Sequence, residues 1–141
     1  ISLTTDIIVG FPGESEADFR ETVSMVEYCG FDMAYIFKYS PRPGTPAFHM
    51  DDDVSHAEKT VRFLELERIQ KSMQHMRLQR YLKATLEVLV EGNSTRTPFS
   101  RTGHSTCHKV VNFDGPDCLP GSIAKVKISE IKSNSLYGEL E

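Results

Sequence analysis

The order of patterns in the first forty residues constrains the fold more than any other feature. Residues 5–10 read Thr-Asp-Ile-Ile-Val-Gly, which predicts a strand covered on both faces in a parallel sheet. Apolar side chains at helical spacing follow between Ser15, a capping residue, and Gly30, a helix stop. Residues 33–39 are again rich in aromatic and β-branched side chains. Because consecutive parallel strands need a covering helix, this order predicts a slice of a (β/α) barrel or of a doubly wound sheet, with further strands upstream of residue 1.

A long helix is predicted next, from a capping-box pattern at Ser55 and Glu58 to near Leu82. Its expected apolar face holds Val61, Leu64, Ile69, Met73 and Met76. Residues 68–83 carry five Lys or Arg and no acid, which suits the negative end of the helix dipole. The same charges fit either contact with RNA or a plain solvated face.

Short strands and turns replace the helical pattern beyond Lys83. Strands are predicted over residues 86–90, 109–113, 123–128 and 136–140. Several strands at this spacing fit a small antiparallel β-barrel of the oligonucleotide-binding kind. We therefore expect an α/β part at residues 1–78, including the long helix, and an all-β part at residues 79–141.

Composition limits the classes of protein that this chain can represent. The 141 residues include 39% hydrophobic and 26% charged side chains, and no apolar run reaches the length of a membrane span. The net charge of -4 combines -7 over residues 1–60 with +3 over residues 61–141. The chain starts at Ile1 without an initiator Met or a signal pattern, so we interpret it as a fragment. Its three scattered cysteines fit reduced thiols, which favours an intracellular protein, cytoplasmic or organellar.

Two strand ends are candidates for chemistry. Gly10 and the following Pro12-Gly13-Glu14 fall at the carboxyl edge of the predicted sheet, where barrel enzymes place their active sites. The alternative is an ordinary strand-to-helix turn. The second strand ends near Arg42, whose guanidinium suits a carboxylate or phosphate. Its alternative is a surface turn with one salt bridge.

Three segments together resemble a known family. Residues 6–14, 31–35 and 37–47, the last containing Arg-Pro-Gly-Thr-Pro-Ala, are similar to the methylthiotransferases among radical S-adenosylmethionine enzymes. The resemblance continues through residues 111–113 and the last strands, which resemble the TRAM domain of that family. It implies the C-terminal segment of a radical SAM (β/α) barrel followed by an RNA-binding TRAM barrel, with the N-terminal domains of the same chain missing.

The resemblance also implies cofactors. The full-length enzymes use S-adenosylmethionine and two [4Fe–4S] clusters to insert a methylthio group into a C–H bond. Cys29, Cys107 and Cys118 match neither cluster-binding set, so we expect this chain alone to bind no cluster or other metal, to carry no catalytic residue and to be inactive. The resemblance assigns Val9, Gly10, Glu14 and Arg42 to the S-adenosylmethionine site. For Arg42, the cofactor carboxylate, the substrate and its own loop stay open as partners.

Residues 37–47 and the Val-Asn-Phe strand favour MiaB-type enzymes, which modify N6-isopentenyladenosine in the tRNA anticodon stem-loop. Enzymes acting on threonylcarbamoyladenosine or on a ribosomal protein are alternatives, as is a non-catalytic RNA-binding module. Basic residues are expected to meet phosphate. The candidates are Arg96, Arg101, Lys109, Lys125 and Lys127, with His104 and His108 as adjuncts.

Overall fold

The computed structural model describes residues 1–94 and 99–141. The described residues form two compact units. One comprises residues 3–74, and the other comprises residues 75–141 together with the first two residues of the chain. Each unit has a hydrophobic core of its own.

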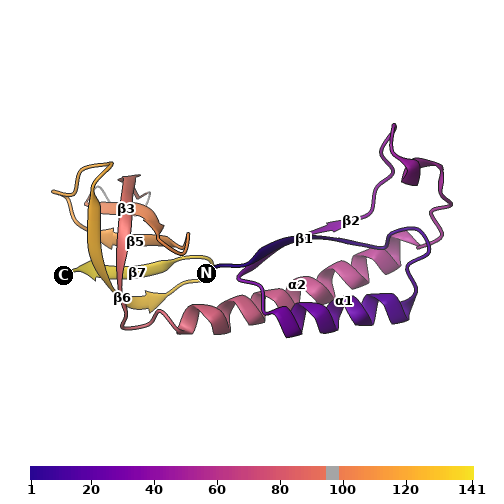
Figure 1. Ribbon diagram of the computed structural model, residues 1–141, viewed down its shortest axis with the longest axis horizontal. Coiled ribbons are helices and arrows are strands. Elements are labelled where there is room, and N and C mark those ends of the chain that lie inside the picture. Colours follow the sequence, from indigo (N-terminus) through magenta and orange to yellow (C-terminus); the bar gives the residue numbers. More distant parts are fainter. Residues whose placement is uncertain (95–98) are drawn as a thin grey trace. The chain divides into compact units, whose positions relative to one another are not determined.

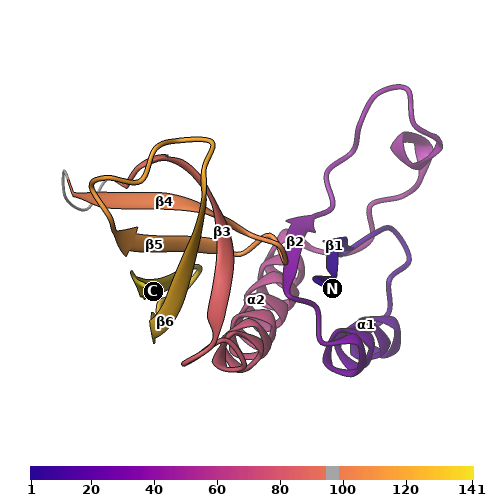
Figure 2. The same ribbon diagram turned by 60° about the vertical axis from the view of Figure 1, so that its left-hand side comes forward.

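The unit at residues 3–74 contains the predicted strand–helix–strand. Strand β1 (Thr4–Val9) pairs in parallel with β2 (Met33–Lys38), and α1 (Glu16–Cys29) connects them. The predicted caps of α1 are confirmed, because Ser15 and Asp18 form a capping box and Gly30 ends the helix in the left-handed conformation. A short 3-10 helix, η1 (Pro46–His49), and the long helix α2 (His56–Gln79) follow. In Figures 1 and 2, α1 and α2 run along the same side of the two strands.

The two faces of β1 differ. Ile7 and Val9 are buried against Phe19, Val23 and Val26 of α1 and Leu66 of α2. Ile8 points to the opposite face and is 52% exposed, as is Phe37 of β2. Among the described residues the helices cover one face of β1, and cover on its second face stays a prediction.

Helix α2 begins after Ser55, whose side chain accepts a hydrogen bond from the Glu58 amide at 3.1 Å, as predicted. Its predicted apolar face is wrong in part, because Val61, Leu64 and Met76 are all more than half exposed. The buried stripe instead holds Lys59, Arg62, Leu66 and Gln70. Their aliphatic stems pack, while Lys59 and Arg62 pair with carboxylates and Gln70 Nε2 donates to the Phe31 carbonyl at 3.1 Å. Among the described residues, no helix is long and apolar enough to span a membrane.

The other unit is a closed barrel of five strands in the order β3-β4-β5-β7-β6. The strands are β3 (Thr85–Asn93), β4 (Ser100–Ser105), β5 (Val110–Asp114), β6 (Ile123–Ile131) and β7 (Leu136–Leu140). Figure 2 shows β3 and β6 crossing in front of β4 and β5. The predicted barrel is confirmed, but it is not wholly antiparallel, since β5 and β7 pair in parallel. This pair closes the barrel, because β7 fills the gap between β5 and β6.

Strand alternation fills the barrel core. Val88, Val90, Val111, Phe113 and Val126 point inward and are at most 1% exposed. Leu78 and Tyr81 join this core from the segment that leads into β3. Burial there raises the pKa of the Tyr81 phenol above its ordinary value of 10.0.

Strand β4 is the element that the sequence patterns do not predict. It reads Ser-Arg-Thr-Gly-His-Ser, with few of the side chains that favour strands. Gly103 explains part of this composition, because a Cβ atom there would collide with the carbonyl oxygen of Leu89 on the neighbouring strand. The position requires a glycine for close backbone approach, and hydrophobicity alone does not reveal such a strand.

Candidate functional site

The turn after β1 is built around a buried ion pair. Gly10 has a φ of 70°, and its amide donates a hydrogen bond to Glu14 Oε2 at 2.6 Å. The same carboxylate oxygen accepts a bond from Arg62 Nη1 at 2.5 Å, and Arg62 Nη1 also reaches the Glu14 carbonyl oxygen at 2.9 Å. The two side chains are only 10% and 3% exposed. Glu14 thus anchors the turn to α2.

Lys59 ties a second part of the same turn to α2. Its ammonium group lies 2.5 Å from Asp52 Oδ1 and 5.1 Å from the centre of the Tyr39 ring. A side chain at Gly10 would collide with the stem of Lys59. Asp53 Oδ1 accepts the Gly13 amide at 2.8 Å, so the acidic stretch 51–53 bonds directly to the turn. Sequence reasoning missed Lys59 and Arg62, because a charged residue on a helix ordinarily indicates a solvated face.

A cavity of about 400 Å³ opens beside the ends of β1 and β2. Its walls are mostly apolar and aromatic, with the rings of Phe11 and Tyr39 packed edge to face at 5.1 Å. Tyr39 is fixed further by a hydrogen bond from its hydroxyl to the Ala47 carbonyl at 2.8 Å. The lining residues are Ile8, Phe11, Phe37, Lys38, Tyr39, Ser40, Arg42, Thr45 and Ala47. Such a cavity suits a flat apolar group carrying an anion near Arg42.

The four predicted cofactor residues do not all meet at this cavity. Arg42 lines it, and within residues 1–94 and 99–141 no carboxylate pairs with its guanidinium. Val9 is fully buried on the helix-facing side of β1. Gly10 and Glu14 lie together in the turn, where the carboxylate is already bonded to Arg62. A part for these four residues in cofactor binding stays a prediction.

The three cysteines are divided between the two units. Cys29 ends α1, whereas Cys107 and Cys118 pack against the core of the barrel. Across the part of the chain that the structure describes, no group of three or more His, Cys, Asp or Glu side chains could hold a metal ion.

On the barrel, Lys125 and Lys127 lie on the exposed face of β6, alternating with buried Ala124, Val126 and Ile128. The predicted alternation is confirmed. Acidic side chains stand directly across from both, Glu87 from Lys125 and Glu139 from Lys127. These carboxylates lower the positive potential that phosphate would meet. RNA contact through the two lysines stays a prediction.

The other predicted RNA contacts have structural partners or fall outside the described residues. Arg101 donates to the Cys118 carbonyl at 2.9 Å and to Asn93 Oδ1 at 2.8 Å, and also bonds the Pro116 carbonyl. It therefore clamps the loop between β5 and β6. Lys109 Nζ donates to Ser2 Oγ at 2.9 Å. Arg96 lies outside the described residues.

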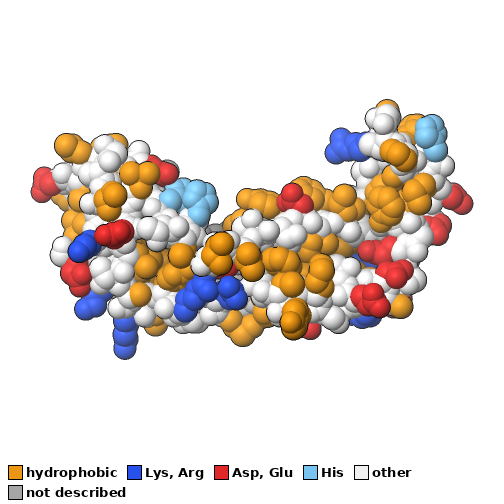
Figure 3. All heavy atoms as spheres, in the orientation of Figure 1, with side chains coloured by type: hydrophobic (Ala, Val, Ile, Leu, Met, Phe, Trp, Pro, Cys, Tyr) orange, Lys and Arg blue, Asp and Glu red, His pale blue; other side chains and the backbone are white. Residues whose placement is uncertain are grey.

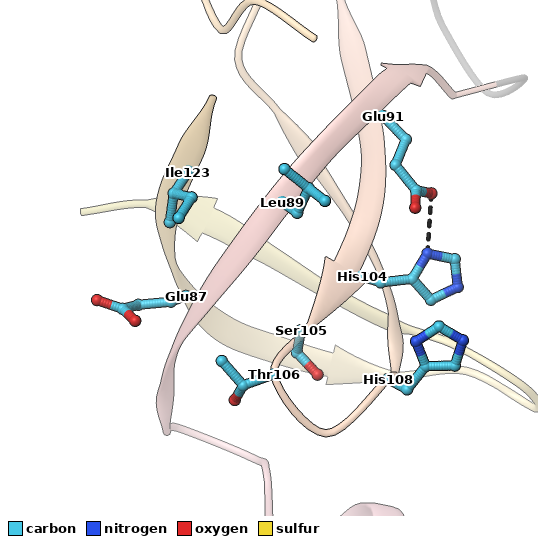
Figure 4. A pocket seen from close by; sticks show the side chains of 8 residues that line it. All are labelled: Glu87, Leu89, Glu91, His104, Ser105, Thr106, His108 and Ile123. Atoms are coloured by element: carbon cyan, nitrogen blue, oxygen red, sulfur yellow. Dashed lines mark hydrogen bonds and ion pairs between the residues drawn. The ribbon is translucent and has the colours of Figure 1, made fainter. Parts of the chain in front are cut away.

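His104 and His108 meet on the barrel surface. Their rings stack with centroids 4.6 Å apart and an interplanar angle of 22°. Glu91 Oε2 lies 2.8 Å from His104 Nδ1. Figure 4 shows this arrangement beside Leu89 and Ile123, and Figure 3 shows histidine gathered on the barrel surface. A cavity of about 240 Å³ lies here, lined by Glu87, Leu89, Glu91, His104, Ser105, Thr106, His108 and Ile123.

Comparison with protein families places a known domain over the barrel. Residues 79–140 match the TRAM domain family. This segment is similar to TRAM domains. The match runs from the end of α2 to the last residue of β7, so the matched segment includes all five barrel strands.

Comparison with characterised proteins extends the resemblance beyond the TRAM domain. The chain is 43% identical over 141 residues to the tRNA-2-methylthio-N(6)-dimethylallyladenosine synthase of Aeromonas hydrophila. It is 45% identical over 139 residues to the synthase of Bacillus pumilus, and the match covers 99% of this chain in both cases. The chain spans only 29% and 27% of the length of these two relatives. Similarity to the tRNA methylthiotransferases, predicted from the sequence, is confirmed.

Proposed function

We propose that this chain is the C-terminal part of a tRNA methylthiotransferase. The observation that carries the proposal is the 43 to 45% identity to enzymes of that name over nearly the whole chain. In this proposal residues 1–78 complete a radical SAM (β/α) barrel, and the TRAM domain with the last residue, residues 79–141, binds tRNA. The enzyme acts inside the cell.

The geometry of β1 and β2 supports a place in a larger barrel. The strands are parallel, joined by a covering helix, and each pairs with only one neighbour among the described residues. Ile8, Tyr35 and Phe37 leave apolar surface on the face away from the helices. In a (β/α) barrel this face is filled by the inward side chains of the other strands.

The proposed substrate is N6-isopentenyladenosine beside the anticodon of tRNA, modified at C2 with a methylthio group. The enzyme name of the relatives, which specifies dimethylallyladenosine, supports this choice. Threonylcarbamoyladenosine and a ribosomal protein are the competing substrates. When bound to the full-length enzyme, S-adenosylmethionine and two [4Fe–4S] clusters would supply the radical and the sulfur.

In the full-length enzyme, Arg42 would hold an anionic group in the cavity at the ends of β1 and β2. The donor set fits, because a guanidinium without a carboxylate partner in the described chain stands beside aromatic walls. The Gly10 backbone would stay close to the ligand, with Glu14 holding the turn through Arg62. Val9 would act only through its main chain, since its side chain packs under the helices.

For the TRAM domain we propose that phosphate is met by exposed cations. Lys125 and Lys127 are the first candidates, because both side chains are exposed and share one strand face. Arg101, Lys109 and Arg96 remain secondary candidates. A TRAM domain working without the barrel chemistry is the competing function, in which RNA binding persists and no nucleoside changes.

The decisive experiment uses the full-length protein that contains this chain. It is expressed in a strain lacking its own tRNA methylthiotransferase, and the tRNA nucleosides are measured by mass spectrometry. We expect 2-methylthio-N6-isopentenyladenosine to reappear, and Arg42→Ala to abolish it while tRNA affinity is kept. Methylthiolation of threonylcarbamoyladenosine instead would show that this nucleoside is the substrate. Full-length protein that binds tRNA and changes no nucleoside would favour the non-catalytic module.

A further inference from the structure

The stacked histidines of the barrel form part of a continuous surface across three strands. Ile123 of β6 stands opposite Leu89 of β3, and Leu89 stands opposite His104 of β4. All three side chains point outward, with Ile123 70% and Leu89 47% exposed. The row is an apolar strip that ends in an imidazole. A solvent-facing strip of this kind ordinarily carries polar side chains.

His108 extends this surface from the turn between β4 and β5. Its φ is 57°, a conformation that few residues other than glycine adopt. Hydrogen bonds from the His108 amide to the Ser105 carbonyl at 2.8 Å and from the Ser105 amide to the Lys109 carbonyl at 3.0 Å hold the turn. This backbone brings the exposed His108 ring into its stack with His104. Such conformations concentrate at functional sites.

The charges around the cavity decide which part of a nucleic acid fits. Among its lining residues there is no Lys or Arg, while Glu87 and Glu91 both stand at its edge. The two carboxylates disfavour a phosphate inside the cavity, and Lys125, which stands across from Glu87, does not line it. A nucleobase with an exocyclic amino group offers what this site accepts, namely a flat ring for the imidazoles and N–H donors for a carboxylate.

We propose that the cavity bordered by Leu89, Ile123 and the His104–His108 stack binds one unpaired amino-bearing base of the RNA. The outer face of the His104–His108 stack is the stacking platform. A carboxylate oxygen of Glu87 or Glu91 at the edge of the cavity accepts a hydrogen bond from the amino group. This inference rests on the proposed RNA-binding function of the TRAM domain and adds a base subsite to it. The lysines of β6, which we propose meet phosphate, do not line this cavity.

The test uses the 141-residue chain and a single-stranded RNA with 2-aminopurine in place of one adenine. Affinity is measured by fluorescence anisotropy at several salt concentrations. His104→Ala combined with His108→Asn removes both rings, and Asn tolerates the left-handed backbone. We expect about five- to tenfold weaker binding, an unchanged salt slope and loss of the 2-aminopurine quenching. His104→Phe should keep the affinity, because it keeps a ring.

Thr106→Ala is the matched control, since Thr106 lines the same cavity without a ring. A second measurement uses the unaltered chain. In its NMR spectrum the imidazole proton signals of His104 and His108 should shift when RNA is added. RNA binding with equal affinity in the ring-free variant, or with unshifted imidazole signals, would overturn the base subsite and leave the proposed function standing. A chain that binds no RNA at all would overturn both.

Discussion

The sheets of the two units differ in how many of their strand edges are paired. Every strand of the five-stranded barrel has two paired neighbours, whereas among the described residues β1 and β2 pair only with each other. The barrel buries its inward row almost completely, and the sheet of β1 and β2 leaves Ile8 and Phe37 half exposed. Local pattern specifies strands in both units, but among the described residues only the barrel satisfies its own strand edges.

The largest expected difference is in backbone protection. Amides of β3 to β7 should exchange with solvent much more slowly than those of β1 and β2, because local opening of a two-stranded sheet breaks few contacts. Hydrogen exchange followed by mass spectrometry measures this on the intact chain, and limited proteolysis should leave a core that begins near residue 80. Exchange of the amides in residues 4–9 as slow as in the barrel strands would contradict this expectation.

Arg62→Ala should produce the next largest effect, confined to the unit at residues 3–74. It leaves the nearly buried Glu14 carboxylate without its cation, which costs about 3 to 5 kcal/mol for a buried pair. Urea unfolding followed by probes in each unit measures the change. Arg20→Ala is the control, because Arg20 is exposed and pairs with Glu16 at the surface. Equal effects of the two substitutions would show that burial of the ion pair is unimportant.

Gly103→Ala tests the barrel in the same way. The added Cβ would collide with the Leu89 carbonyl, so the paired strands must move apart at a cost of about 1 to 3 kcal/mol. Gly92→Ala on β3 is the matched control, since a Cβ there has no atom within 4 Å. The urea midpoint of the barrel should fall for the first variant alone. A normal midpoint for Gly103→Ala would mean that the backbones are farther apart than described.

Lys125→Ala with Lys127→Ala should leave the barrel folded and change only its electrostatics. If each lysine replaces one counterion, the salt slope of tRNA binding should fall by about one or two units in the full-length protein. Base preference should hardly change. Lys71→Ala on the basic part of α2 is measured beside it. A slope that falls for Lys71 and not for the pair would move the RNA surface to the helix.

The smallest expected effect concerns Tyr81. Because burial raises its pKa above 10.0, the folded state keeps the phenolic proton to higher pH than the unfolded chain. The contribution of Tyr81 to barrel stability is therefore fully present below about pH 10 and decreases as the pH rises through its raised pKa. Thermal unfolding from about pH 8 to about pH 11 should show this decrease, and Tyr81→Phe should reduce it. An identical decrease in both proteins would assign it to another group.

Local patterns determined those features whose causes lie within a few residues. The capping box at Ser15 and the stop at Gly30 specify α1, and alternation around Val126 specifies both faces of β6. The sequence also predicted the strand–helix–strand order, the barrel and the similarity to the methylthiotransferases. The caps of α1 depend on local interactions, and the two faces of β6 follow a pattern that repeats with a fixed period.

Only the tertiary structure decided features that depend on distant partners. Lys59 and Arg62 are buried because they pack against the turn at Gly10 and pair with the carboxylates of Asp52 and Glu14. The parallel pairing of β5 with β7 and the glycine of β4 follow from barrel closure. Local pattern cannot predict these contacts, because their free energy comes from groups that are far apart in the sequence and adjacent only after folding.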